Sequence, residues 1–332
     1  MGLLGLAATG ICSMIGASIN VVPFMIHRSV PGIGPYVLPA FLFAAIPAIF
    51  AALAYCMLAS AMPRAGGSYI YASRAISPYL GFIASFSQWF GLSIVIGAVS
   101  YVLVPFFRDI ALTLQVPAIA SLLEKGAVRV SISLTILWSF VVINIRGVKS
   151  YERTVVPLMF LMFGFGFIVI FSGFFFTTTD FISTAQAKGQ QVVTAPAGEF
   201  SLTSFLSAAA VLFSSFIGFD SIAQAGGEAK NPSRALPLAI VIAITVVGTY
   251  YFLFTSAVYH MVPWNFVAGE AAIKDISAPG LLTYLLPVGW AVAIVAGATI
   301  SLLNDLPSML LSVSRLMFAD RKSTRLNSSH RL

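Results

Sequence analysis

The chain has 332 residues, of which 59% are hydrophobic and only 9% are charged. Soluble domains carry about 25% charged residues, so the composition excludes an ordinary soluble protein and indicates a polytopic membrane protein. The formal net charge of +7 does not indicate nucleic-acid binding, because the charges fall in short segments between apolar runs. We therefore expect the lipid bilayer, and no nucleic acid, as the partner of this chain.

Apolar runs of about 20 residues mark transmembrane helices. The sequence predicts about eight of them, near residues 3–25, 36–61, 78–104, 127–144, 155–176, 203–225, 237–258 and 281–317. With a cytoplasmic N-terminus, the short inner connections are rich in Lys and Arg, as the positive-inside rule requires. We predict a multi-pass protein of the cell inner (plasma) membrane with its N-terminus in the cytoplasm.

Small and hydroxyl residues interrupt the first span at the middle of the membrane, at Ser13, Gly16, Ala17 and Ser18. One interpretation is close helix packing, because small residues allow membrane helices to approach each other. The other interpretation is a broken helix. The sixth span decides which of the two we favour.

The sixth span carries the same interruption and adds an acid. Its apolar run meets Ser214, Ser215 and Gly218, and Asp220 follows. Backbone that leaves a helix at membrane depth is tolerated only beside protein or a wet cavity, and an ionisable residue there suggests a functional site. An alternative is that Asp220 only caps a second half-helix through its side chain. Interruptions at corresponding positions of two halves predict a transporter site within an inverted repeat.

The eighth span holds a second intramembrane acid. Ser301, Asn304 and Asp305 lie inside an apolar run, and Pro307 follows. An acid at this depth either binds a coupling ion or serves as a structural group bonded to Ser or backbone atoms. The two cysteines, Cys12 and Cys56, have no metal or redox spacing, so we predict no metal site and no cofactor other than a coupling ion.

Four segments together resemble the amino acid–polyamine–organocation (APC) superfamily of transporters. They are Ser13–Ile19 (SMIGASI), Pro63–Tyr71 (PRAGGSYIY), Asn144–Gly147 (NIRG) and Phe216–Asp220 (FIGFD), the last continuing to KNPSR at 230–234. The resemblance implies an all-α membrane protein with the five-plus-five inverted-repeat fold of the leucine-transporter type, in which helices 1 and 6 are broken. It also implies an amino acid substrate.

The resemblance further implies which residues bind the substrate. Backbone N–H groups at Gly16, Ala17 and Ser18 would bind its carboxylate, and carbonyl groups near Ser13, Ser214 and Ile217 would bind its ammonium group. The predicted substrate site comprises Ser13, Ile15, Gly16, Ala17, Ser18, Ser214, Ser215, Ile217, Gly218 and Asp220. Aromatic gate candidates are Phe213, Phe216 and Phe219.

The coupling ion is either Na⁺ or H⁺, and exchange is the further alternative. Some proton-coupled relatives carry a Lys in the fifth helix, and this chain has none between Val155 and Phe176. The candidates for ion coupling are therefore Ser301, Asn304 and Asp305. Other function classes remain open: an amino acid sensor, a channel, or an intramembrane enzyme that uses Asp220 and Asp305 as an acid pair.

The domain prediction is one transmembrane transporter domain over residues 1–319. It comprises a first repeat, 1–176, and a partial second repeat, 203–319. The second repeat has only three predicted helices, so we expect the chain to be an inactive fragment. Residues 320–332 resemble a translated sequencing adapter and are interpreted as a non-native tail. The sequence does not predict the oligomeric state.

Overall fold

The computed structural model describes residues 1–16, 18–190, 192 and 199–329. Within that part every regular element is helical, and eight helical segments are long and apolar enough to cross a membrane. Helices satisfy all their own backbone hydrogen bonds, which the interior of a bilayer demands. The prediction of an all-α multi-pass membrane protein with eight spans is confirmed.

Six of the spans are single helices, and the first and sixth are interrupted. The uninterrupted spans lie in α3 (Val37–Ala61), α5 (Pro78–Thr113), α7 (Gly126–Ile145), α8 (Val148–Phe175), α12 (Pro232–Met261) and α15 (Val288–Ser329). The first span comprises α1 (Leu3–Ile15) and α2 (Ser18–Ser29). The sixth comprises α10 (Leu202–Phe213), the 3₁₀ turn η2 (Ser214–Phe216), α11 (Asp220–Gln224) and the 3₁₀ turn η3 (Ala225–Glu228).

Several span boundaries differ from the prediction. The fifth span was expected to begin at residue 155, but α8 begins at Val148. The third span was expected to end at residue 104, but α5 continues to Thr113, and Arg108 pairs with the adjacent Asp109 in the added turns. The eighth was expected to begin at residue 281, but α15 begins at Val288 after Pro287. Proline disfavours helical geometry in the residue before it, so residues 278–282 form a separate short helix, α14 (Ala278–Leu282).

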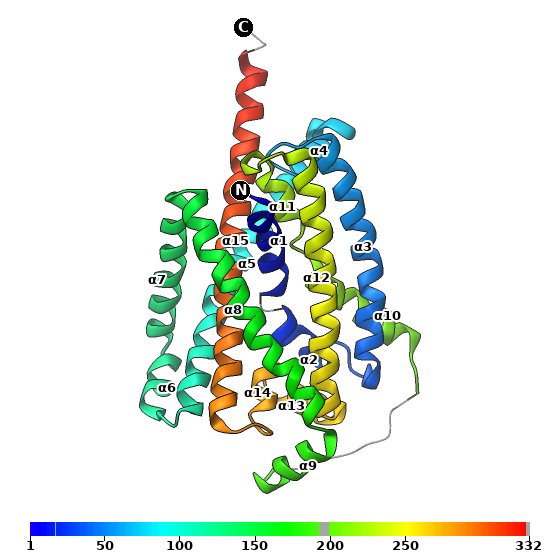
Figure 1. Cartoon of the computed structure of the whole chain (residues 1–332), viewed down its shortest axis with the longest axis vertical. Helices are drawn as coiled ribbons and strands as arrows, with labels where there is room; N and C mark the ends of the chain where they lie inside the picture. Colours follow the sequence, from blue (N-terminus) through cyan, green and yellow to red (C-terminus); the bar gives the residue numbers. More distant parts are fainter. Residues whose placement is uncertain (17, 191, 193–198, 330–332) are drawn as a thin grey trace.

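Short helices fill the connections between the spans. They are η1 (Gly34–Tyr36), α4 (Ser68–Ala75), α6 (Pro117–Glu124), α9 (Thr178–Ala187), α13 (Trp264–Ile273) and α14. Figure 1 shows that the N-terminus, α4 and the C-terminal part of α15 share one end of the bundle, whereas α6, α9, α13 and α14 lie at the other. The connections that were expected to be cytoplasmic therefore share one end.

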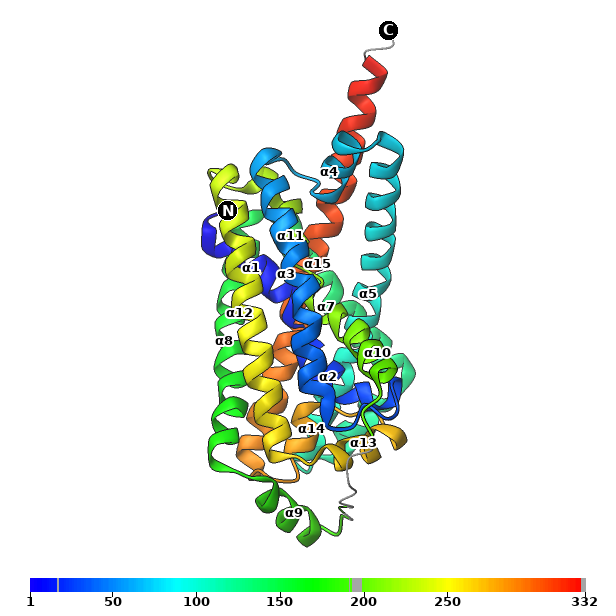
Figure 2. The same ribbon diagram turned by 90° about the vertical axis from the view of Figure 1, so that its right-hand side faces the viewer.

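The interrupted first span lies inside the bundle. Its most apolar window is 81% buried within the chain and that of the eighth span 78%, whereas the window of α7 is only 11% buried. α1 contacts α8, α12 and α15, and Figure 2 shows it behind α12 and α3. The polar residues of the first and eighth spans therefore face protein, as their cost in lipid requires.

Candidate functional site

The first span breaks where its small residues predicted a break. α1 ends at Ile15, Gly16 follows with φ 11° and ψ −126°, and α2 begins at Ser18. Both Ile15 and Gly16 are buried. The predicted site residue Ala17 and the side chain of Ser18 lie outside the described residues. A helix end leaves backbone carbonyls without partners in the helix, so this break supplies acceptors at the middle of the bundle.

The sixth span leaves the α-helical conformation over residues 214–219. After η2, Ile217 is extended (φ −71°, ψ 133°), and Gly218 has φ +136°. Side chains rarely adopt this φ, and a Cβ on Gly218 would lie 2.5 Å from the Ser13 carbonyl oxygen. The two breaks are therefore in contact.

Asp220 is the first residue of α11, and Phe219 takes the N-cap position without a side-chain cap. The Asp220 carboxylate also interacts with backbone groups of Gly218 and Ser221 at this helix start. The capping interpretation therefore stays open beside a functional role.

Tyr251 of α12 connects the two breaks, and the sequence analysis missed it. Its hydroxyl oxygen lies 2.5 Å from the carbonyl oxygen of Met14 and 3.1 Å from that of Ser215. The residue is 1% exposed. One buried O–H group therefore serves unwound backbone from both interrupted spans and fixes their relative position.

The two breaks open into one cavity of about 470 Å³, which we call the central cavity. It is lined by residues of α1, α5, the break in the sixth span, α11 and α15: Ser13, Ser87, Gln88, Gly91, Leu92, Val95, Val99, Ser214, Ile217, Gly218, Asp220, Ser221, Gln224, Asp305, Met309 and Ser312. Six of the predicted site residues are among them: Ser13, Ser214, Ile217, Gly218, Asp220 and Asp305. The structure brings these six together from three separate spans.

Other predicted residues lie behind the lining. Ile15 and Ser215 are fully buried, and Gly16 packs against the carboxylate of Asp305. A Cβ on Gly16 would lie 2.6 Å from the Asp305 carboxyl carbon, so only glycine fits this approach without a shift. Their roles in substrate binding stay predictions.

The three gate candidates do not line the central cavity. Phe216 packs edge-on against Phe41 at 5.5 Å and against Tyr251 at 5.6 Å, and Phe219 packs edge-on against Tyr55 at 5.5 Å. Phe213 is partly buried against the core. The described contacts of Phe216 and Phe219 are packing contacts, and the gate stays a prediction.

The coupling candidates divide into one cavity residue and two supporting residues. Asn304 donates to Cys12 Sγ at 2.9 Å and to the Val155 carbonyl oxygen at 3.2 Å, and it therefore holds α15 against α1 and α8. Ser301 donates to the Gly16 carbonyl oxygen at 2.9 Å. Asp305 alone reaches the central cavity; it is 4% exposed, and its Oδ1 has no hydrogen-bond partner among the described residues.

Asp220 is held by two glutamines that the sequence analysis missed. Gln88 of α5 and Gln224 of α11 each donate their side-chain Nε2 to Asp220 Oδ2, the latter at 3.1 Å. Two signals were available in the sequence. Gln88 is an isolated amide in the apolar run of the third span, and Gln224 follows Asp220 by four residues, one helical turn.

The ionisable side chains that line the described part of the central cavity are both acids. Asp220 and Asp305 line it, and none of the described lining residues is Lys, Arg or His. Charges at membrane depth normally pair with each other or mark a substrate or ion path. The cavity therefore suits ligands that bring positive charge.

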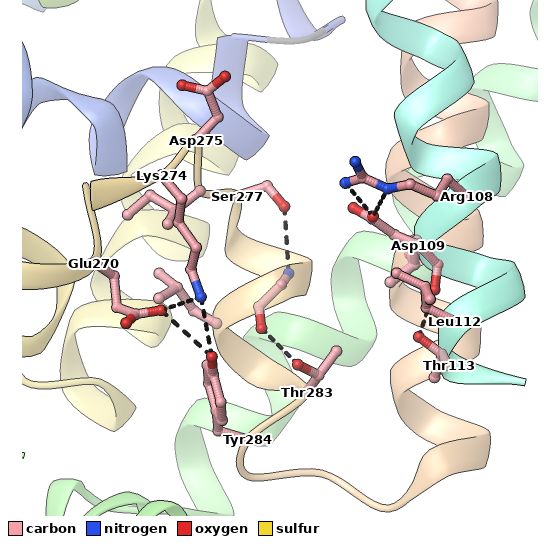
Figure 3. A pocket seen from close by; sticks show the side chains of 14 residues that line it. Arg108, Asp109, Leu112, Thr113, Glu270, Lys274, Asp275, Ser277, Thr283 and Tyr284 are labelled. Atoms are coloured by element: carbon pink, nitrogen blue, oxygen red, sulfur yellow. Dashed lines mark hydrogen bonds and ion pairs between the residues drawn. The ribbon is translucent and has the colours of Figure 1, made fainter. Parts of the chain in front are cut away.

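A second cavity of about 310 Å³ lies at the opposite end of the bundle, and we call it the outer cavity. It lies between the end of α5, α13, α14 and the start of α15, and it contains both acids and bases (Figure 3). Lys274 contacts Glu270 at 2.5 Å and the Tyr284 hydroxyl at 3.2 Å, and Arg108 contacts Asp109 at 2.7 Å. The sequence analysis did not predict this cavity.

The comparisons with known proteins agree with this architecture. The profile of the amino acid permease family matches residues 1–332. Similar proteins include cationic amino acid transporter 4 of Homo sapiens, 25% identical over 96% of this chain and 49% of the relative. The vacuolar cationic amino acid transporter 4 of Arabidopsis thaliana is 26% identical over 95% of this chain and 52% of its own.

The name of a bacterial relative refers to a different class of amino acid. The branched-chain amino acid permease BcaP of Bacillus subtilis is 25% identical over 96% of this chain and 66% of its own. The chain spans about half the length of the two cationic transporters. Because the family profile covers all 332 residues, the chain belongs to the amino acid permease family of the APC superfamily.

Proposed function

We propose that this chain forms the core of a secondary active transporter that moves amino acids across the membrane by alternating access. The observation that carries the proposal is the meeting of two unwound spans at one buried cavity, with Ser13 and Gly218 in contact. Broken helices at the middle of the bilayer are the usual way in which transporters bind charged substrates. Family membership and the names of the relatives support the same substrate class.

The proposed binding mode uses backbone dipoles. The N-terminal end of α2 favours the substrate carboxylate, because a helix start carries unpaired N–H groups and partial positive charge. The ends of α1 and α10 offer carbonyl oxygens to the ammonium group, and Ser13, Ser214 and Ile217 line the cavity there. A zwitterion is thereby bound and oriented without a charged side chain.

The direction of the cavity supports alternating access. Its lining on α15 runs from Asp305 to Ser312, away from the breaks and toward the end of the bundle that carries the N-terminus. On α5 the lining reaches Ser87, close to the start of that helix at the same end. We propose that this end is cytoplasmic, in the inner (plasma) membrane, and that the cavity belongs to an inward-facing state.

Asp305 is the proposed coupling residue. Its buried Oδ1 has no partner among the described residues, and its carboxylate contacts the backbone at the break of the first span. A carboxylate beside free carbonyl oxygens suits Na⁺, and a buried carboxylate also suits a proton. An inverted repeat, which we propose for residues 1–176 and 203–319, would supply the symmetry by which the two sides open in turn.

Measurements of net amino acid movement across the membrane distinguish a transporter from the remaining alternatives. Family membership favours a permease over an intramembrane enzyme that would use Asp220 and Asp305 as an acid pair. A sensor would bind an amino acid without net movement, and a channel would carry currents beyond carrier turnover.

The test is uptake of a panel of radiolabelled amino acids into liposomes that contain the complete protein of which this chain is expected to be a part. The panel includes basic and branched-chain members, with and without Na⁺, at a mildly acidic and a mildly alkaline pH. Saturable uptake of at least one amino acid, driven by one of the two ion gradients or by exchange, is the expected result. Saturable binding without any uptake would identify a sensor and contradict the proposal.

A further inference from the structure

We infer that the side chain of the transported amino acid carries a positive charge, which binds at the acceptor cluster formed by Asp220, Gln88 and Gln224. The inference rests on the proposed function and adds the class of side chain. The backbone at the two breaks accounts for the α-amino and α-carboxyl groups. The acceptor cluster is a separate part of the same cavity.

The hydrogen bonds of the cluster fix which atoms remain free. Both glutamines donate their Nε2 to the same oxygen, Asp220 Oδ2. An ionised carboxylate only accepts hydrogen bonds, so neither amide can turn its carbonyl oxygen toward Asp220 without repulsion. Each amide is therefore held with its Oε1 directed to other partners.

Those two carbonyl oxygens have no hydrogen-bond partner among the described residues. Gln88 Oε1 and Gln224 Oε1 are both buried, and the whole Gln224 residue is 0% exposed. Buried polar atoms are nearly always paired, so each unpaired one calls for an explanation. Because the glutamines and Asp220 all line the cavity, a bound substrate can supply the missing donors.

The missing partner must be a donor with several N–H groups. A guanidinium group carries five N–H donors and an ammonium group three, and neither accepts a hydrogen bond. Their positive charge also suits the carboxylate of Asp220, because charge-assisted hydrogen bonds are stronger than neutral ones. An apolar side chain would leave the two amide oxygens unpaired and the carboxylate without a counter-charge, and this loss is the basis of strong discrimination.

The charge balance of the cavity leads to the same conclusion. Two acids line it and no described basic residue does. One coupling cation at Asp305 leaves one negative charge, and the zwitterionic part of a substrate adds none. A positively charged side chain at Asp220 balances the remaining negative charge of the cavity, and an unbalanced charge is costly at membrane depth.

The rest of the lining suits the stem of such a side chain. Leu92, Val95, Val99 and Met309 form an apolar part of the cavity on α5 and α15. Long basic side chains bury their methylene groups against apolar surface and keep the charged head at a polar site. Lysine, ornithine and arginine have this shape.

The experiment compares ligands that differ only in charge. Competition binding to the same complete protein in nanodiscs pairs arginine with citrulline and lysine with norleucine. The basic member of each pair should bind at least about tenfold more tightly, which corresponds to about 1.4 kcal/mol.

Two variants test whether the acceptor cluster is responsible. In Asp220→Asn and in Gln88→Leu the affinity ratio between the basic ligand and its neutral partner should fall by about tenfold, and thermal unfolding of each variant reports whether it is folded. Ser87→Ala is the matched control, because Ser87 lines the same cavity on α5 but the side-chain donors to Asp220 Oδ2 are Gln88 and Gln224.

The outcomes separate this inference from the proposed function. If norleucine and citrulline bind as tightly as lysine and arginine, the inference is wrong and the proposed function stands. If basic ligands are preferred but both variants retain the preference, the cluster is not the site. If neutral ligands bind only with Na⁺, and Asp220→Asn removes that requirement, the cluster binds the ion and the inference is overturned. If no member of the panel binds, both proposals fail.

Discussion

The central and outer cavities differ in how their charges are balanced. In the outer cavity Lys274 is paired with Glu270 and Arg108 with Asp109, so the ionic groups satisfy one another. In the central cavity the two acids Asp220 and Asp305 have no described basic partner in the lining. A cavity whose charges are balanced within the protein is stable when empty, whereas an unbalanced one gains most from a ligand.

The two cavities also differ in exposure. The side chains of Lys274 and Asp275 are 52% and 90% exposed, whereas Asp305 is only 4% exposed. Water and salt screen exposed charges, so outer ion pairs contribute little free energy. The same charge at the central cavity has a much larger effect, because it is desolvated. Substitutions in the two places should therefore have very different consequences.

The largest effect is expected from Gly218→Ala. The residue has φ +136°, and a Cβ would lie 2.5 Å from the Ser13 carbonyl oxygen. Backbone strain of this kind costs about 1–3 kcal/mol, and relieving the clash would move the two breaks apart. We expect amino acid binding to weaken by more than about tenfold, measured by competition binding.

Gly164→Ala is the matched control for that change. Gly164 lies in α8, and a Cβ there would meet nothing within 4 Å. Its thermal unfolding should change by less than about 0.5 kcal/mol, with binding unaltered. Equal binding by both alanine variants would show that the contact between the two breaks is unimportant for the site.

Asp305→Asn is expected to have the next largest effect, because it removes one of the two unbalanced charges. Ion-dependent accumulation in liposomes should fall by about tenfold or more, corresponding to at least about 1.4 kcal/mol. Glu270→Gln removes a carboxylate from the outer cavity and should leave ion dependence unchanged. Full ion-driven uptake by Asp305→Asn would exclude Asp305 as the coupling residue.

The sequence predicted the eight spans and both breaks for a physical reason. Long apolar runs report the bilayer directly, and Ser, Gly and Asp inside such a run are costly in lipid. Gly16, Gly218 and Asp220 were found in this way. The same reasoning could not find Tyr251, because an isolated tyrosine in an apolar helix is typical of ordinary packing until its hydroxyl partners are known.

The acceptor cluster was missed because its members come from separate spans. Gln88 lies 132 residues from Asp220 along the chain, and nothing in a local pattern connects them. The gate candidates stay predictions, because their described contacts are with packed side chains. Phe216 and Phe219 adjoin the break in sequence, but the helical turn directs them against Phe41 and Tyr55, away from the cavity lining.

Tyr251→Phe should have an intermediate effect. It removes the hydroxyl shared by the Met14 and Ser215 carbonyl oxygens, and the loss of one such bond costs about 0.5–1.5 kcal/mol. We expect lower thermal stability together with weaker amino acid binding, because both breaks lose a common support.

Tyr259→Phe provides the matched comparison on the same helix. Tyr259 also donates to a backbone carbonyl, that of Pro23 at 2.6 Å, but it does not line the central cavity. Its loss should lower stability by a similar amount and leave the affinity for amino acids unchanged. An equal loss of affinity in both variants would mean that stability alone, not the position of the breaks, controls binding.

The smallest effect is expected at the outer ion pair of Glu270 and Lys274. Partial burial lowers the pKa of Lys274, but hydrogen bonds to Glu270 and Tyr284 outweigh it and leave the pKa above its ordinary value. A raised pKa means that the stabilisation is fully present below the ordinary lysine pKa and is lost only as the pH rises through the higher value.

A double-mutant cycle of Glu270→Gln and Lys274→Met, measured by thermal unfolding, should give a coupling free energy of about 0–1 kcal/mol between the two side chains. This coupling free energy should be the same at mildly acidic and mildly alkaline pH. A coupling energy several times larger would mean that this ion pair contributes more to stability than an exposed pair does. A loss of amino acid binding would show that the charges of the outer cavity act on the ligand, as those of the central cavity are proposed to do.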